Sequence, residues 1–113
     1  MRETRDPIPP GTLDMLILKT LARSGCLHGF EIAEAIRQSS DDIFLVEEGS
    51  LYPALQRLLK EELVKAEWAT SSTNRRVRIY KVTAAGTKHL EREVSRFERM
   101  LEGITRVLAR GES

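Results

Sequence analysis

The most constraining feature of the sequence is a heptad pattern near its C-terminus. Apolar residues recur there at alternating steps of four and three, at Leu90, Val94, Phe97, Leu101, Ile104 and Leu108. This is the spacing of a helix that packs lengthwise against another helix. A helix of roughly 25 residues is longer than a small helical domain covers, so the most economical partner is a second copy of the chain. We therefore predict a dimerisation helix over 84–110, with these six residues in the dimer interface and Thr83 as its N-cap.

The first half of the chain predicts three shorter helices. The first is expected over 12–23 with Thr12 as N-cap, and the second over 30–37. The third is expected to begin with Ser50 as N-cap and to hold Pro53 in its third position. Its inward stripe has the spacing of a buried helical face and consists of Leu51, Leu55, Leu58 and Leu59.

The period of the pattern changes after the third helix. Residues 63–68 and 75–82 each predict a strand, and the small polar residues 69–74 between them are typical of a turn. Three helices followed by a β-hairpin is the element order of a winged helix. The predicted fold class is therefore mainly α with a small β-hairpin (α+β). We expect an N-terminal arm over 1–10, a winged helix-turn-helix domain over 11–83 and then the long helix.

Charge is balanced overall but not locally. The chain has 18 basic and 17 acidic residues, a formal net charge of +1, which excludes a uniformly basic nucleic-acid binder. Residues 63–89 nevertheless carry six basic side chains and one acidic one. Taken alone, such a run is most often a solvated surface. Next to a helix with a polar, hydrogen-bonding face it favours binding to double-stranded DNA, because a helix fits the major groove and arginines fit phosphates or a narrow minor groove.

The candidate DNA-binding residues lie on the exposed face of the third helix and in the hairpin. The helix side chains can contact base edges near its start and phosphates near its end, and the hairpin arginines can contact the backbone; the candidates are Ser50, Tyr52, Gln56, Arg57, Lys60, Arg75, Arg76 and Arg78. The alternative for Tyr52 is a packing role, and Tyr80 is expected to be structural.

Other classes of function have little support. The single cysteine, Cys26, allows no disulfide framework and is expected to be a small core residue, with His28 in a loop or a helix cap. We expect no metal, no cofactor and no catalytic group, since neither a ligand cluster nor a triad is present. No apolar run is long enough to span a membrane, and the expected location is the cytoplasm.

The last helix also carries a candidate ligand site. Phe97 is expected to pack in the dimer, and a sharper alternative is that Phe97 and Met100 line a cavity between protomers for a flat apolar effector.

Four segments resemble the PadR family of bacterial transcriptional regulators. They are the stretch 11–18 (GTLDMLIL), 28–32 (HGFEI), 48–58 (EGSLYPALQRL) and 80–86 (YKVTAAG). The similarity runs from about residue 10 to 108, and the single C-terminal helix is similar to the smaller subfamily, with an acidobacterial-type opening at 11–14.

The resemblance implies a winged helix-turn-helix homodimer that mostly represses promoters at inverted repeats, in some members released by phenolic or multidrug-like ligands. By position it adds Pro53 to the DNA contacts. In some members a tryptophan of the last helix lines the ligand pore; here the only tryptophan is Trp68 in the first hairpin strand, and Phe97 is the nearest substitute. The alternatives are a winged-helix protein-interaction module and a small-molecule sensor with weak DNA affinity.

Overall fold

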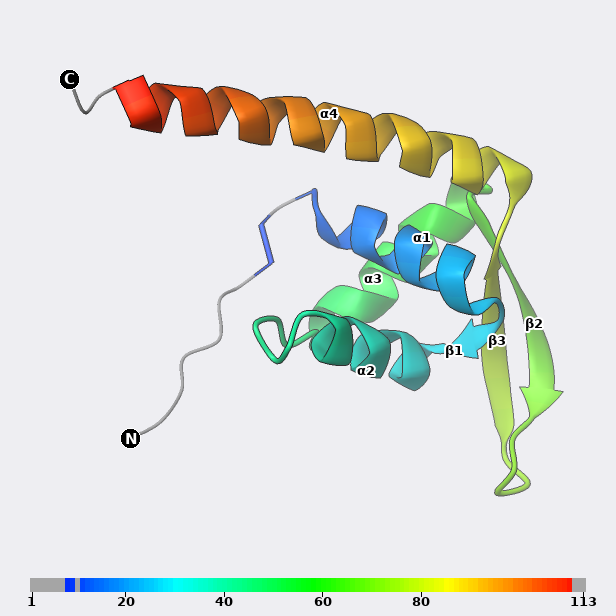
Figure 1. The fold of residues 1–113 in the computed structure, drawn as a ribbon. Helices are drawn as coiled ribbons and strands as arrows, with labels where there is room; N and C mark the ends of the chain where they lie inside the picture. Colours follow the sequence, from blue (N-terminus) through cyan, green and yellow to red (C-terminus); the bar gives the residue numbers. More distant parts are fainter. Residues whose placement is uncertain (1–7, 10, 111–113) are drawn as a thin grey trace, which may run out of the picture.

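The computed structural model describes residues 8–9 and 11–110, so the predicted arm over 1–10 lies almost entirely outside the described residues. These described residues form four helices and a small antiparallel sheet (Figure 1), in the order α1 (Leu13–Ser24), β1 (Leu27–His28), α2 (Gly29–Ser39), α3 (Glu48–Lys60), β2 (Val64–Thr70), β3 (Arg76–Val82) and α4 (Ala84–Arg110). This confirms the α+β winged-helix fold with a long C-terminal helix.

The core lies between α1, α2 and α3 and is closed on one side by the sheet. The apolar stripes of the three helices meet there, and the largest fully buried side chains are Ile17, Leu18, Leu21, Ile32, Leu51, Leu55 and Leu58. Burying a side chain of this size stabilises the fold by roughly 1.5–3 kcal/mol. The three short helices are therefore held by shared burial rather than by their own propensities.

The sheet has one strand that the sequence did not predict. Its order is β1-β3-β2, and β1 pairs Leu27 with Tyr80 and His28 with Ile79. Two residues are too few to produce an alternating pattern. His28 also caps α2, because its ring nitrogen accepts from Glu31 N and Glu31 Oε1 accepts from His28 N. The expected cap role of His28 is confirmed.

The prediction that Cys26 is a core residue is wrong. The thiol is exposed, because Gly25, at φ 88°, ends α1 and turns the chain just before β1. Leu27, the next residue, is partly buried and packs against the core. In extended backbone successive side chains point to opposite sides, which leaves Cys26 toward solvent.

The start of α3 also differs from its prediction. Ser50 is not the N-cap: the carbonyl of Glu47 accepts from Ser50 N at 3.0 Å and from Leu51 N at 2.9 Å, so the helix begins at Glu48. Pro53 is then inside the helix rather than in its third position. Because proline has no N–H, the carbonyl of Gly49 loses its usual partner, and Gly49 is exposed to water.

The start of α4 follows its prediction. Thr83 Oγ1 accepts from Gly86 N at 3.0 Å and donates to Glu62 O at 2.8 Å, which ties the helix cap to the end of α3. A Cβ on Gly86 would lie 2.0 Å from the carbonyl oxygen of Leu63, so only glycine fits there. The cap and this close approach together fix the direction in which α4 leaves the body.

Candidate nucleic-acid interface

The outward face of α3 is polar. Opposite the buried leucines, the exposed positions Gly49, Pro53, Gln56 and Lys60 follow one another at helical spacing, and Ser50 is exposed beside them. Lys60 lies in the last turn. A helix with this face can enter a groove with its N-terminal half over the base edges and a cation over the backbone.

The two flanks of α3 are fixed by neighbouring helices. On one flank Tyr52 lies against α2, because a Cβ on Gly29 would come 2.5 Å from the Tyr52 hydroxyl oxygen. The ring is still 41% exposed, so it both packs and faces solvent. Tyr80 is 5% exposed, which agrees with its expected structural role, and burial raises the pKa of its hydroxyl.

On the other flank Arg57 pairs with α1. Arg57 Nη2 donates to Asp14 Oδ1 at 2.9 Å, and the side chains are 57% and 29% exposed. A pair this exposed contributes at most about 1 kcal/mol to stability. Arg57 was predicted as a phosphate contact, and the structure shows that it already has a carboxylate partner.

We call the β-hairpin the wing and define it as β2, β3 and the turn between them over 71–75. It carries the predicted arginine contacts of the hairpin. The turn is closed by Ser71 N donating to Arg75 O at 2.8 Å, and by Arg75 N donating to Ser71 Oγ at 3.2 Å. Asn74 has φ 64°, the left-handed conformation that asparagine tolerates. Arg75 is therefore a residue of the turn, whereas Arg76 and Arg78 are residues of β3.

One face of the wing continues from the core to the tip. Its cross-strand pairs are Val64–Val82, Ala66–Tyr80, Trp68–Arg78 and Thr70–Arg76. The first two pairs pack on the helices, and the last two project beyond them. The core-facing side of the sheet thus becomes a basic surface at the tip, which points away from α4 (Figure 1).

Trp68 is a member of this surface that sequence reasoning missed. Its ring is 57% exposed, with the guanidinium carbon of Arg76 4.6 Å and that of Arg78 5.6 Å from the ring centroid. The sequence gives no local signal for this contact, because the pairing of Trp68 with Arg78 depends on the register between two strands.

The four predicted cationic contacts other than Arg57 have no carboxylate partner among the described residues and can bind phosphates. Within 8–9 and 11–110, no carboxylate oxygen lies within 4.0 Å of the charged groups of Lys60, Arg75, Arg76 or Arg78. Each can therefore exchange water and counterions for DNA without breaking an ion pair.

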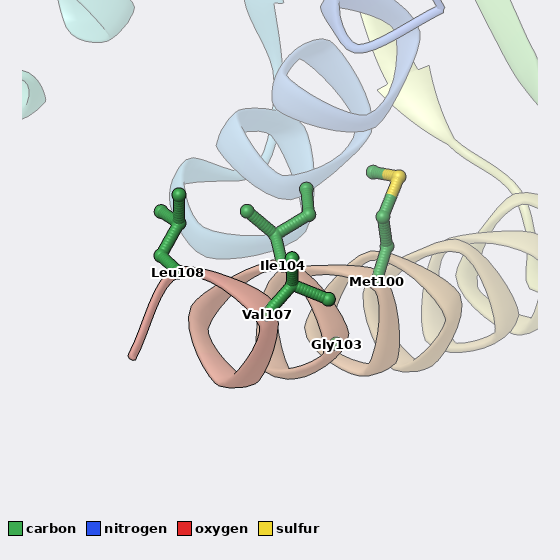
Figure 2. Close-up of a pocket in the computed structure, with 5 residues that line it drawn as sticks. All are labelled: Met100, Gly103, Ile104, Val107 and Leu108. Carbon is green, nitrogen blue, oxygen red and sulfur yellow. The ribbon is translucent and has the colours of Figure 1, made fainter. Parts of the chain in front are cut away.

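The six residues of the predicted dimer interface divide into two groups. Leu90 is 6% exposed and belongs to the chain's own core, with Val94 half-buried against it, because the first turns of α4 cover α1. These two positions therefore pack within the chain itself, which the heptad pattern alone did not predict. Beyond them the helix leaves the body and exposes what we call the apolar patch of α4: Phe97, Met100, Leu101, Ile104, Val107 and Leu108. Figure 2 shows Met100, Ile104, Val107 and Leu108 projecting from one side of the helix.

Phe97 and Met100, the predicted effector residues, line a hollow between α4 and the start of α1. It measures about 150 Å³ and is completed by Gly11, Thr12 and Met15, with Glu93 and Arg96 at its edge. Arg96 Nη1 and Glu93 Oε2 are 3.2 Å apart. Pockets for drug-sized ligands measure about 300–1,000 Å³, so this hollow alone is smaller than such a pocket.

Neither a metal site nor a membrane-spanning helix is found in the part of the chain that the structure describes. No three His, Cys, Asp or Glu side chains gather there in a way that would hold a metal ion. No helix among these residues is both long and apolar enough to cross a bilayer.

Known proteins share this sequence pattern and fold. The sequence model of the transcriptional regulator PadR-like family matches residues 17–92. A transcriptional regulator from Clostridium thermocellum is 28% identical, with 85% of this chain and 92% of that one covered and a TM-score of 0.78. A PadR family transcription regulator from Clostridium difficile is 28% identical, with coverages of 87% and 99% and a TM-score of 0.75.

A third structure was solved with nucleic acid. PadR of Bacillus subtilis, in complex with operator DNA, is 23% identical, with 76% of this chain and 48% of that one covered and a TM-score of 0.66. The family resemblance expected from the four motifs is confirmed. This chain therefore belongs to the PadR-like family of transcriptional regulators, which bind DNA and are not enzymes.

Proposed function

We propose that this regulator is a homodimeric repressor that reads an inverted-repeat operator with α3 and the wing of each protomer. The observation that carries the dimer is the apolar patch of α4. Its six side chains are between 36% and 71% exposed and share one face of a single helix. Exposed apolar surface of this extent marks an interaction site, and a second copy offers an identical, self-complementary face.

The charge distribution supports the DNA-binding half of the proposal. The apolar patch carries no charge, whereas the wing, on the far side of the body, holds three arginines that pair with no carboxylate of the described residues. A dimer formed through α4 leaves both wings and both α3 helices free. In helix-turn-helix dimers the two half-sites lie about one helical turn, roughly 34–36 Å, apart. The Bacillus subtilis relative, which shares the fold, was solved on operator DNA.

Within each half-site we assign different tasks to different side chains. Ser50, Tyr52 and Gln56 can exchange hydrogen bonds with base edges, with Pro53 in contact beside them. Lys60, Arg75, Arg76 and Arg78 are assigned to phosphates, and Arg57 joins them if it leaves Asp14. A repressor of this kind would act in the cytoplasm, where its promoter lies.

We also propose that the hollow beside Phe97 and Met100 binds an apolar aromatic effector once a second protomer completes it. The observation in favour concerns α1, whose first turn lines the hollow. The same helix holds Asp14, which pairs with Arg57 of α3. A ligand there can therefore change the position of α3 through α1.

The proposal is tested by sedimentation equilibrium of the full chain, together with footprinting of the DNA upstream of its own gene. We expect a dimer at micromolar concentration and a footprint with two-fold symmetry. A monomer, or a footprint without a dyad, contradicts the proposal. A chain that fails to shift any duplex at low salt is instead a protein-interaction module.

A further inference from the structure

Trp68 is the only aromatic residue of the wing that lies outside the core, and it contacts two arginines. Trp68 is paired directly with Arg78 and lies diagonal to Arg76 in the antiparallel register. Both guanidinium carbons lie within 6 Å of the ring centroid, at 4.6 and 5.6 Å, which is the range of a cation–π interaction. Trp68 is also the only tryptophan of the chain.

Burial does not explain why an indole stands at this position. Val64, Ala66 and Tyr80 already close the core at the base of the sheet, and Trp68 is one step beyond them on the same face, 57% exposed. Strands favour aromatic as well as β-branched side chains, but most of this indole is exposed and adds little to the core. The ring contacts two like charges that would otherwise repel each other.

A ring that contacts two guanidinium groups restricts both of them. A free arginine side chain populates many rotamers, and ordering it at an interface reduces the affinity of a complex. Here the ring attracts both guanidinium groups through its electron-rich face. Arg76 and Arg78 are two residues apart on a strand, so their side chains leave the same face about 7 Å apart.

We infer that Trp68 is a positioning residue of the DNA interface, which holds Arg76 and Arg78 side by side so that they meet two backbone phosphates without first being ordered. The inference rests on the proposed role of the wing. It assigns Trp68 no base contact and no part in the dimer.

A positioning residue has a different signature from a residue that binds phosphate. Replacing an arginine that binds phosphate lowers both the affinity and the slope of log K against log salt, by about 1 for each phosphate that is no longer neutralised. Replacing Trp68 leaves both charges in place. We therefore expect Trp68→Leu to weaken duplex binding about five- to tenfold, the loss of preorganisation for two side chains, with the salt slope unchanged.

The experiment measures duplex affinity by fluorescence anisotropy of a labelled duplex over a salt series, for the full chain and for four variants. Trp68→Phe keeps a ring and is expected to stay within about twofold of the original affinity. In the double variant Arg76→Ala, Arg78→Ala, adding Trp68→Leu is expected to change affinity less than about twofold, since the ring then has nothing to position. Thermal unfolding of each variant identifies any loss of fold.

A second measurement needs no DNA. Because Trp68 is the sole tryptophan, its quenching by acrylamide reports the cover that the two arginines give. We expect faster quenching in the Arg76→Ala, Arg78→Ala variant than in the original chain. Equal quenching shows that the stack does not exist in solution and overturns the inference.

The outcomes distinguish the role of the wing from the role of Trp68. If the double arginine variant binds duplexes as well as the original chain, the proposed role of the wing fails. If that variant is weakened while Trp68→Leu binds normally, or if Trp68→Phe is as weak as Trp68→Leu, the wing keeps its role and the inference about Trp68 fails.

Discussion

The wing and the C-terminal half of α4 both project beyond the core, on different sides of the body, and their chemistry is opposite (Figure 1). The wing exposes Arg75, Arg76 and Arg78 around one aromatic ring, whereas the apolar patch of α4 exposes only uncharged side chains. Neither surface stabilises the isolated chain much, since neither is buried in it. This difference supports our proposal that the wing binds a polyanion and that α4 packs against an apolar face.

The difference in chemistry between the two surfaces is tested most directly by the salt dependence of binding. Salt is also expected to have the largest effect of the tests below. If the six wing arginines of a dimer contact phosphates, the affinity for duplex DNA falls about a thousandfold between about 50 and 200 mM salt. The dimer dissociation constant, which depends on apolar burial, is expected to change less than about twofold. Anisotropy and sedimentation over the same salt series measure the two constants. A parallel fall of both would show that the two surfaces do not act separately.

A charge placed in the apolar patch tests the α4 surface alone. Ile104 is 49% exposed within the chain, so Ile104→Glu leaves the core intact and places a carboxylate in the proposed seam of each protomer. We expect the dimer dissociation constant to rise at least about a hundredfold, because an apolar side chain is removed from the seam and a charge is desolvated there. Sedimentation equilibrium measures the change.

The matched control for that variant is Ser95→Glu. Ser95 is exposed on the same helix, about half a turn away from the apolar stripe, so the same charge is added outside the seam. An equal loss of dimer in both variants would mean that added charge, and not its position in the patch, is responsible.

Base reading by α3 is expected to have a smaller and more selective effect. Gln56 lies on the outward face of α3, and a bidentate amide contact to a base discriminates by about 1–3 kcal/mol. Gln56→Ala should therefore reduce operator affinity about tenfold and leave random duplex affinity nearly unchanged. Competition between the two duplexes measures the ratio, and equal losses on both would remove Gln56 from base reading.

A single wing arginine contributes less than this and without sequence preference. Arg75→Ala is expected to weaken binding to operator and random duplexes alike by about fivefold, and to reduce the salt slope by about 1 per engaged protomer. Arg99→Ala, which removes the same charge from an exposed position of α4, is the control. An unchanged slope for Arg75→Ala would remove it from the phosphate contacts.

Much of the fold could be predicted from the sequence, because its helices and strands have strong hydrophobic periods. The leucine stripe of α3, the alternation in β3 and the cap at Thr83 each depend on neighbours close in the sequence, and each was predicted correctly. Two-residue β1 was missed because no period exists over two residues. Ser50 was expected as a cap on residue type alone, but the backbone hydrogen bonds begin at Glu47.

What the sequence could not provide was the contact between elements far apart in the chain. A heptad pattern specifies that Leu90 faces another helix but not which one, and here that helix is α1 of the same chain. The Trp68 stack and the Asp14–Arg57 pair depend in the same way on strand register and on helix packing. Pattern predicts which face is apolar or basic, and only the packed structure identifies the partner.

The Asp14–Arg57 pair gives the smallest expected effect. It tests whether Arg57 belongs to the basic DNA-binding surface or to the helical body. Its 2.9 Å contact joins α3 to α1, and its exposure limits its contribution to stability to about 1 kcal/mol. If Arg57 belongs to the basic surface, Asp14 competes with phosphate for it, and Asp14→Asn should raise duplex affinity about twofold while lowering the free energy of unfolding by less than about 1 kcal/mol. Arg57→Ala in the Asp14→Asn background should then abolish the gain. An Asp14→Asn variant with unchanged DNA affinity and lower stability would place Arg57 with the helical body, and leave the phosphates to Lys60 and the wing.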